Sequence, residues 1–172
     1  LLYVYFHQLF AQVTNPPIDA IREEIVTSTR VYIGSEGDLL APSPQSCRQL
    51  RLPNPIMTDA DLARVKALDS EGFKPCTISI LYNVADGGKG IEKAMRRMYA
   101  ELDEKFREGC TIFILSDRGV SRDMAPIPAL LATAGLHHHL IRRETRTQCA
   151  IVVESGEPRE VHHFALLIGY GA

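Results

Sequence analysis

Two short polar groups, Asp117-Arg118 and Glu154-Ser155, contain the residues best placed to do chemistry, because each directly follows an uncharged apolar run. Such runs are typical of strands buried on both faces of a parallel sheet. Ligands bind at the carboxyl ends of parallel strands, where successive strand ends lie close together. We therefore expect these four residues to meet in one polar site, which either binds a small polar ligand or joins two loops by an ion pair.

No catalytic arrangement accompanies these groups. The sequence contains no nucleophile with an evident base partner, and no pair of carboxylates is clearly placed for acid–base catalysis. A second glycine-rich stretch, Gly87 to Gly90, matches neither the G-x-x-x-x-G-K-[ST] nor the G-x-G-x-x-G phosphate-binding pattern. A glycine-rich turn between a strand and a helix is the favoured interpretation of that stretch. The residues alone therefore indicate no reaction.

Histidines form two tracts, 137–139 and His162-His163. Successive side chains on a helix point about 100° apart, so three consecutive histidines cannot converge on one metal ion. We expect the first tract to be packed and hydrogen-bonded near the core. His162 and His163 could likewise be either metal ligands or packed side chains. We group them with the strand-end residues as candidates for a polar cluster between domains. No catalytic, cofactor-binding or metal-ligating residue is predicted.

The four cysteines are Cys47, Cys76, Cys110 and Cys149, and no C-x-x-C pair occurs among them. The last three stand just before or at the start of a predicted strand, so we expect them near the amino-terminal edge of the sheet. Structural zinc sites usually show close ligand pairs, which are missing here. The pattern favours reduced, buried thiols of a cytosolic protein over a metal site.

The elements that position these residues repeat along the second part of the chain. Apolar runs at 77–81, 111–115 and 150–153 recur about every 35 residues, and a helical pattern follows each. The first helix should end near residue 108, with Gly109 at its C′ position. Pro126 is expected to be the first residue of the second helix, which is apolar on several sides and should be deeply buried.

The final helix should follow Pro158 and carry Val161, Phe164, Ala165 and Ile168 on one face.

Residues 1–73 are expected to be irregular and proline-rich, and residues 74–172 to form β-α repeats. A helical pattern over 1–13 should end before Asn15-Pro16-Pro17. Asp19 is a plausible N-cap of a short helix, and Thr58 opens another, which reaches about residue 68. The expected fold is α/β, a single domain over 1–172 with a mainly parallel sheet that resembles part of a barrel.

Composition excludes several classes of protein. The net charge is −2, with 45% hydrophobic and 23% charged residues, so no general attraction to nucleic acid or anionic lipid is expected. No apolar run approaches the roughly 20 residues that span a membrane. Residues 1–10 lack the features of a signal peptide, which favours a cytoplasmic location. The chain begins without Met inside an apolar segment, so we expect a fragment of a larger protein.

Long, ordered motifs spread over nearly the whole chain resemble the large (alpha) subunit of glutamate synthase. These motifs occupy residues 10–19, 21–24, 114–119, 125–131, 137–141, 153–156, 160–165 and 169–172. They belong to the central domain of that family, which lies between the glutamine amidotransferase domain and the FMN-binding synthase domain. The resemblance implies a spacer with an α/β architecture akin to part of a barrel, which contributes to the walls of an internal ammonia channel.

The resemblance also implies what the parent enzyme does. Glutamine is hydrolysed, the ammonia passes through the channel, and its addition to 2-oxoglutarate gives two glutamates in total. Reduced FMN delivers the electrons, with a 3Fe-4S centre and an electron-donating subunit or ferredoxin as further partners.

The catalytic parts of that enzyme have no counterpart in this sequence. Leu1 is not the N-terminal catalytic cysteine of the amidotransferase domain, and clustered cysteines for the iron–sulfur centre are missing. We therefore expect a fragment that neither hydrolyses glutamine nor binds FMN. Two rival hypotheses are a free-standing small-molecule binding module, which would use the carboxyl ends of the parallel strands, and a plain interaction domain.

Overall fold

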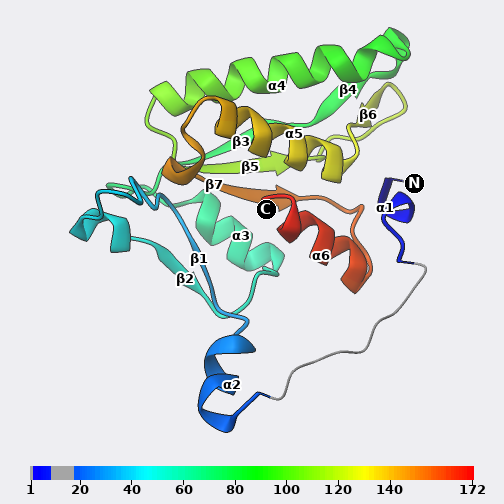
Figure 1. Cartoon of the computed structure of the whole chain (residues 1–172). Coiled ribbons are helices and arrows are strands. Elements are labelled where there is room, and N and C mark those ends of the chain that lie inside the picture. The colour runs from blue at the N-terminus through cyan, green and yellow to red at the C-terminus, as the bar shows by residue number, and fades with distance from the viewer. Residues whose placement is uncertain (1, 9–17) are drawn as a thin grey trace.

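The computed structural model describes residues 2–8 and 18–172. Its centre is a parallel sheet of three strands, β3 (Pro75–Ser79), β5 (Ile112–Ser116) and β7 (Ala150–Glu154), in the order β3-β5-β7 (Figure 1). The predicted α/β fold with a mainly parallel sheet is thus confirmed, and the strands of the described residues close no barrel.

β5 lies in the middle because its sequence suits burial on both faces. All five of its residues are buried, and four of them, from Ile112 to Leu115, are completely inaccessible. Phe113 is opposite Cys76 on one side and Ile151 on the other, so both edges of β5 are paired. An uncharged run without alternation is the pattern that such a strand requires.

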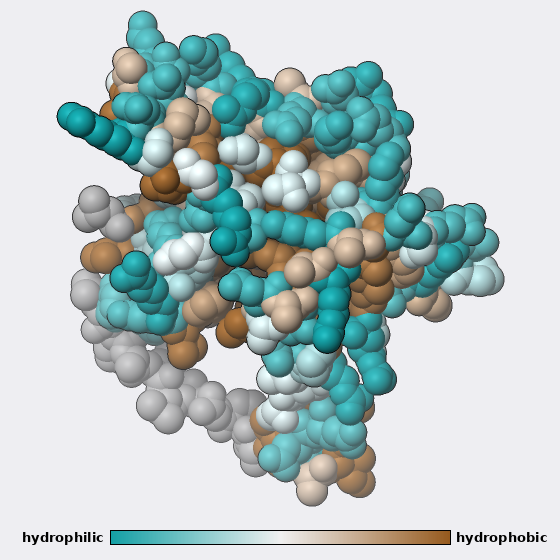
Figure 2. All heavy atoms as spheres, turned by 180° about the vertical axis from the view of Figure 1, so that it is seen from behind, coloured by the Kyte–Doolittle hydropathy of each residue, from teal (hydrophilic) through white to brown (hydrophobic). Residues whose placement is uncertain are grey.

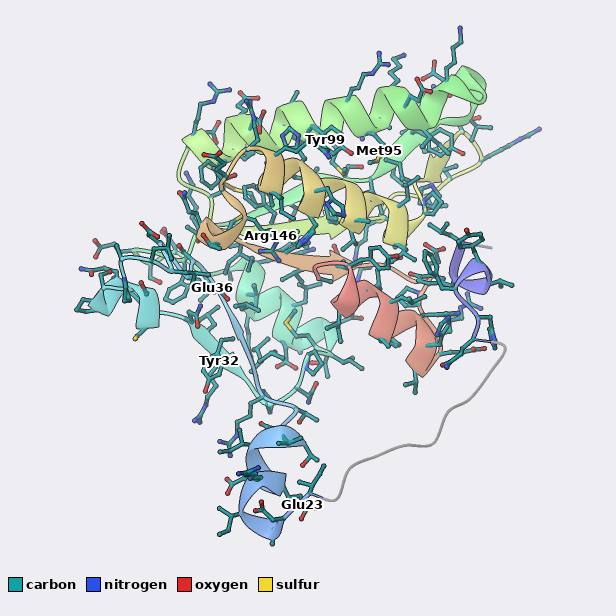
Figure 3. All side chains as sticks on the ribbon, viewed as in Figure 1. Glu23, Tyr32, Glu36, Met95, Tyr99 and Arg146 are labelled. Atoms are coloured by element: carbon teal, nitrogen blue, oxygen red, sulfur yellow. A yellow bond between two sulfur atoms is a disulfide. The ribbon has the colours of Figure 1, made fainter. Side chains whose placement is uncertain are left out.

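One face of the sheet is covered by α4 (Lys89–Arg107) and α5 (Ala129–Arg142), which enclose the largest hydrophobic core. As predicted, Gly109 follows α4 with a φ of +88°, a left-handed conformation that suits glycine. Gly135 of α5 faces Met95 and Tyr99 of α4, whose positions Figure 3 labels. A Cβ atom at Gly135 would collide with both side chains, so glycine lets the two helices approach closely.

The opposite face packs on α3 (Asp59–Lys66) and on the antiparallel pair β1 (Val31–Ile33) and β2 (Leu50–Leu52). Leu62 and Val65 of α3 are buried against the sheet. The predicted capping box at Thr58 is present, because its hydroxyl accepts a hydrogen bond from the Asp61 N–H at 3.2 Å.

A third cluster joins α5 to α6 (Val161–Gly169) and to α1 (Leu2–Tyr5), which lie together in Figure 1. Sharing a face of α6 does not bury the predicted residues, since Val161 is 87% exposed and Ile168 is 48% exposed, whereas Leu167 is buried. The short helix meets α5 and α1 through the side that carries Leu166 and Leu167, so packing by neighbouring helices decides which apolar residues are covered.

Arg146 ties α6 to the start of β7 from the 3₁₀ turn η3 (Arg146–Gln148). Its guanidinium donates to His137 Nδ1, to the Cys149 carbonyl and to the Gly171 carbonyl, each at 2.9 Å. Burial, together with the nearby Arg146 charge, lowers the pKa of His137, which keeps Nδ1 free to accept. The end of the chain is therefore fixed beside the amino end of β7.

The first and second repeats contain an extra antiparallel pair that was not predicted, β4 (Leu81–Asn83) with β6 (Met124–Pro126). Pro126 is therefore not the first residue of a helix. The chain stays extended there because Pro126 lies opposite Leu81 and the Ile127 N–H donates to the Ile80 carbonyl at 2.8 Å. α5 begins three residues later, after Pro128. The predicted deep burial of this helix holds for one side only, because six of its residues are buried but Leu131 is 39% exposed and Ile141 is 46% exposed.

Gly87 and Gly88 form the turn from the 3₁₀ segment η2 (Val84–Asp86) into α4, which begins with Lys89 and Gly90, as expected for a glycine-rich connection.

The first part of the chain contains more regular structure than expected, namely the β1–β2 pair and the 3₁₀ turn η1 (Pro44–Cys47), besides the predicted helix α3. It also contains α2 (Ala20–Val26), whose predicted cap is confirmed, since Asp19 Oδ1 accepts from the Ile21 and Arg22 N–H groups at 3.0 and 2.9 Å. α2 projects from the body and carries hydrophobic surface (Figures 1 and 2). Of the predicted helix over 1–13, residues 2–5 form α1, and 9–13 lie outside the described residues, as does Asn15-Pro16-Pro17.

No helix in the described ranges is both long and apolar enough to span a bilayer.

Candidate functional site

Glu154, the last residue of β7, is the centre of a polar cluster at the carboxyl end of the sheet. Its side chain is only 8% exposed. Oε1 accepts a hydrogen bond from Arg118 Nε at 2.6 Å, and Oε2 accepts from Lys66 Nζ and from Ser116 Oγ, both at 2.7 Å. The cluster thus joins the ends of β5 and β7 to the last turn of α3.

The electrostatics of this cluster keep Glu154 ionised. Burial alone would raise the pKa of its carboxyl, but the hydrogen bonds from Arg118, Lys66 and Ser116, with the Lys66 charge, lower that pKa to about 2. The hydrogen bond to Glu154 in turn raises the pKa of Arg118. A carboxylate with both oxygens occupied and so low a pKa is a poor proton acceptor at neutral pH, so this arrangement suits structural support better than acid–base catalysis.

A second group of contacts, centred on Asp117, lies directly beside the Glu154 cluster. Ser155 Oγ donates to Asp117 Oδ2 at 2.6 Å, and the Gly156 N–H donates to the same oxygen at 3.1 Å. The Asp117 N–H donates to the Glu154 carbonyl at 3.1 Å, which connects the Asp117 contacts with the Glu154 cluster. The structure therefore brings together Asp117, Arg118, Glu154 and Ser155 as neighbouring loop contacts.

Within the described residues, neither His162 nor His163 contacts the Glu154 cluster. His162 Nε2 lies 3.3 Å from the Tyr3 carbonyl oxygen, and the His163 ring stacks on Tyr3 with centroids 4.3 Å apart. His163 Nδ1 also accepts from the Arg159 N–H at 3.1 Å. Both histidines thus fasten the start of α6 to α1, and their place in a cluster between domains stays a prediction.

Within the tract at 137–139, His137 and His139 are half-buried and hydrogen-bonded, as expected, whereas His138 is exposed. His139 Nε2 lies 2.8 Å from Asp103 Oδ1, and its ring stacks on Tyr99 at 4.6 Å. Asp103 also accepts from Arg143 at 2.6 Å, so α4 and α5 share a polar contact at this point. Among the described residues, no three His, Cys, Asp or Glu side chains are grouped as metal ligands.

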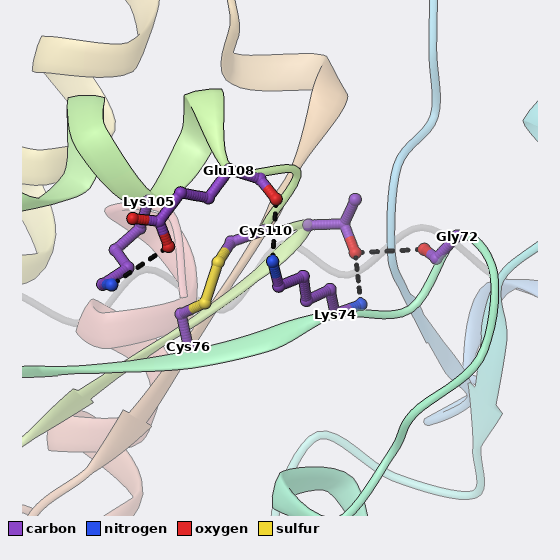
Figure 4. The surroundings of a disulfide bond; sticks show 7 residues. Gly72, Lys74, Cys76, Lys105, Glu108 and Cys110 are labelled. Atoms are coloured by element: carbon purple, nitrogen blue, oxygen red, sulfur yellow. Dashed lines mark hydrogen bonds and ion pairs between the residues drawn. A yellow bond between two sulfur atoms is a disulfide. The ribbon is translucent and has the colours of Figure 1, made fainter.

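The opposite end of the sheet holds a disulfide bond between Cys76 of β3 and Cys110, just before β5 (Figure 4). The prediction that these cysteines lie at the amino-terminal edge is confirmed, but the prediction that they are reduced is wrong. Parallel pairing brings their Cα atoms within 6.1 Å, a separation that a disulfide spans.

Polar contacts surround this disulfide: Lys74 Nζ donates to the Glu108 carbonyl at 2.8 Å, and Thr111 Oγ1 donates to the Gly72 carbonyl at 3.0 Å.

The other two cysteines are free. Cys149 is buried, which raises the pKa of its thiol to about 11, whereas Cys47 is exposed.

A large cleft of about 1350 Å³ runs along β7, on the side away from β5. β1 and α3 form one wall, and α6 forms the other. Figure 3 labels Tyr32 and Glu36 on the β1 side and Arg146 near the amino end. The polar cluster lies at the carboxyl end of the cleft, where Asp117, Arg118 and Ser155 contribute to the lining.

Sequence reasoning missed two members of the Glu154 cluster. Ser116 directly follows the predicted apolar run 111–115, and only its position at a strand end hinted at a role. Lys66 comes from α3, where it follows the buried Leu62 by one helical turn. That spacing places it towards the sheet, but nothing in the sequence connects it with a residue 88 positions away.

The sequence model of the glutamate synthase central domain family matches residues 1–172. The chain is 46% identical over 171 residues to "Glutamate synthase [NADPH] large chain" of Bacillus subtilis, covering 99% of this chain and 11% of the relative. It is 44% identical over 174 residues to "Glutamate synthase [NADH]" of Schizosaccharomyces pombe, covering 100% of this chain and 8% of the relative.

A third relative, "Ferredoxin-dependent glutamate synthase 2" of a Synechocystis strain, is 37% identical over 176 residues, covering 100% of this chain and 11% of the relative. The chain therefore spans about a tenth of the length of these curated relatives.

Proposed function

The chain belongs to the glutamate synthase central domain family, and on this premise we propose that it is the spacer between the glutamine amidotransferase and FMN-binding synthase domains of a longer polypeptide. The observation that carries the proposal is the match of the family over all 172 residues. We further propose that residues 1–172 act as one domain within an enzyme that makes two glutamates from glutamine and 2-oxoglutarate.

A supporting rather than catalytic role agrees with the geometry of the strand ends. Glu154 is held by two cations and a hydroxyl, and Asp117 is held by Ser155 and a main-chain N–H. Side chains whose polar atoms are already occupied can fix the loops that face a neighbouring domain, but they leave little capacity for proton transfer. The isolated chain is expected to have neither glutaminase nor glutamate synthase activity.

The electron donor, the FMN and the 3Fe-4S centre are proposed to lie outside this chain. Relatives named for NADPH, NADH and ferredoxin all match this chain over nearly its whole length. Their similarity supports the proposal that other parts of the enzyme determine which electron donor is used. The described residues also do not fit a cluster site, since Cys76 and Cys110 are bonded to each other and no group of three metal ligands occurs among them. A cytoplasmic location is part of the same proposal.

A contribution to the walls of the ammonia channel completes the proposal, and a chimera tests it. The matched 171 residues of the Bacillus subtilis large chain would be replaced by this chain. The chimera, assembled with its electron-donating partner, is expected to keep glutamine-dependent glutamate synthesis, with little ammonia released to the solution. Ammonia-dependent synthesis by the same sample controls for the synthase site. A folded chimera that hydrolyses glutamine but releases all of the ammonia would contradict the channel role.

The cleft favours one second candidate, a small-molecule binding module, because its polar end lies at the carboxyl ends of two parallel strands. Thermal unfolding of the isolated chain with FMN, glutamine or 2-oxoglutarate separates the two candidates. The spacer proposal expects an unchanged midpoint with all three compounds. A rise that saturates with ligand concentration would favour the binding module.

A further inference from the structure

Among the described residues, β7 is an edge strand with one row of unpaired main-chain groups. The Ala150 N–H donates to the Thr111 carbonyl at 2.9 Å, and the Glu154 carbonyl accepts from the Asp117 N–H at 3.1 Å. Main-chain groups of Ala150, Val152 and Glu154 therefore face β5. Because the direction alternates along a strand, the N–H and C=O groups of Ile151 and Val153 face the cleft, and no hydrogen bond of the described residues uses them.

The walls beside this row are apolar on both sides. β1, β2 and α3 contribute aliphatic side chains, the segment between β2 and α3 contributes Met57, and α6 contributes its own apolar residues; the lining includes Val31, Ile33, Leu62, Phe164, Leu167 and Ile168. Unpaired strand groups at the base of an apolar cleft form a template for another strand, which would satisfy two donors and two acceptors at once.

The topology sets the direction in which such a strand would run. Each new strand of the parallel sheet is added on the same side of the previous one, in the order β3-β5-β7. A helix follows each strand (α4, α5 and α6), and α5 packs on α6. Gly171 is held by Arg146 at the amino end of β7, and Ala172 lines the cleft. A chain that continues from this point enters the cleft parallel to β7, and strand-to-strand connections of this kind are almost always right-handed.

We propose that the free edge of β7 takes a fourth parallel strand, supplied by the glutamate synthase polypeptide beyond the segment matched here. This inference rests on the proposed function, since a longer polypeptide must provide the strand. With apolar walls on both sides, the occupant should be a short continuous apolar run like β5, rather than an alternating one.

Hydrogen–deuterium exchange tests the added strand directly. The amides of Ile151 and Val153 would be compared in the isolated chain and in the Bacillus subtilis chimera. We expect both amides to exchange at least about tenfold more slowly in the chimera, because a hydrogen bond of ordinary strength gives about that much protection. The Val152 amide, which already faces β5, is the internal control. Equal rates at Ile151 and Val153 in the two proteins would overturn the proposal.

Protection that is present in the isolated chain and grows with its concentration would also overturn it. That outcome would assign the edge to a second copy of the chain.

Paired variants give an independent measurement. Val153→Pro removes the N–H that faces the cleft, whereas Val153→Ala keeps it and loses part of the side chain. The two variants should lower the unfolding midpoint of the isolated chain to a similar extent, and the proline variant should be clearly worse in the chimera. Equal effects of the two variants in the chimera would contradict strand addition.

The two proposals can fail separately. A chimera that makes glutamate normally yet exchanges rapidly at Ile151 and Val153 would refute only the added strand. A chimera with a protected edge that releases all of its ammonia would refute only the channel role.

Discussion

The two ends of the parallel sheet are held by different chemistry. At the amino end, a covalent bond joins Cys76 to Cys110 and so connects β3 with the start of β5. At the carboxyl end, Glu154 connects β7 with β5 and α3 through charged and neutral hydrogen bonds. The first end responds to reductant, and the second responds to pH and salt. Because the two ends depend on different chemistry, a perturbation of one end should leave the contacts of the other nearly intact, even though β5 belongs to both.

The largest effect is expected from breaking the amino end. Reduction, or the double substitution Cys76→Ser with Cys110→Ser, removes a cross-link between residues 34 positions apart. The free energy of unfolding should fall by about 3–4 kcal/mol, because the unfolded chain regains the entropy of that loop. Urea unfolding with and without a phosphine reductant measures the loss. Cys47→Ser, at an exposed free cysteine, is the matched control, and midpoints unaffected by reductant would contradict the prediction.

Breaking the carboxyl end should have a somewhat smaller effect. Glu154→Gln keeps the shape of the side chain but leaves Lys66 and Arg118 without their counter-charge, at an expected loss of about 2–3 kcal/mol. Glu92→Gln is the control, since Glu92 is 74% exposed in its pair with Arg96. Equal unfolding free energies for the two variants would show that the cluster adds little to stability. The reductant dependence should persist in both variants.

Acid should weaken the same end without substitution. The pKa of Glu154 is about 2 in the folded protein and near its ordinary value of 4.5 in the unfolded chain. The unfolded chain therefore takes up the proton first as pH falls, and this stabilisation is complete above 4.5 and declines towards 2. Between pH 6 and pH 3 the loss should be about 2 kcal/mol. The measurement is the difference between wild type and Glu154→Gln across this range, which should shrink on acidification; a constant difference would refute the assignment.

The smallest effect is expected at the rim of the carboxyl end. Arg118 is 65% exposed and is also 3.6 Å from Asp59, so Arg118→Ala should lower the free energy of unfolding less than any of the changes above. Because exposed charges are screened, the loss should be smaller in 1 M salt than in dilute buffer. The disulfide contribution should not change with salt. Chemical unfolding by urea at both ionic strengths distinguishes the two ends, and a salt-independent loss would place Arg118 among the buried contacts instead.

What could be predicted from the sequence was local. The three parallel strands followed from uncharged runs, and the neighbouring positions of Asp117 and Glu154 followed from the rule that parallel strands end at one edge. The helix end at Gly109 and the caps at Asp19 and Thr58 were likewise visible in a few consecutive residues. The strands, the helix end and the caps each depend on one short segment, and the meeting of Asp117 with Glu154 needs only the added rule about strand ends.

The features that were missed depend on contacts between distant segments. Lys66 reaches Glu154 across 88 positions, and the disulfide depends on the register between β3 and β5. Pro126 has every local property of a first helical residue, but its pairing with Leu81 keeps the chain extended. The burial of Leu167 in place of Val161 reflects the neighbours of α6 and not its own pattern.

The exposure of α2 has a practical consequence for handling this protein. None of its residues is buried, although Ile21 and Ile25 form an apolar face. A helix of seven residues without tertiary support is marginal in water, so it should unfold locally far more often than α4 does. Trypsin should therefore cut first after Arg22 and Arg30, and leave a resistant product that begins near β1. A partner that rests on this helix would reveal itself by slowing that cleavage.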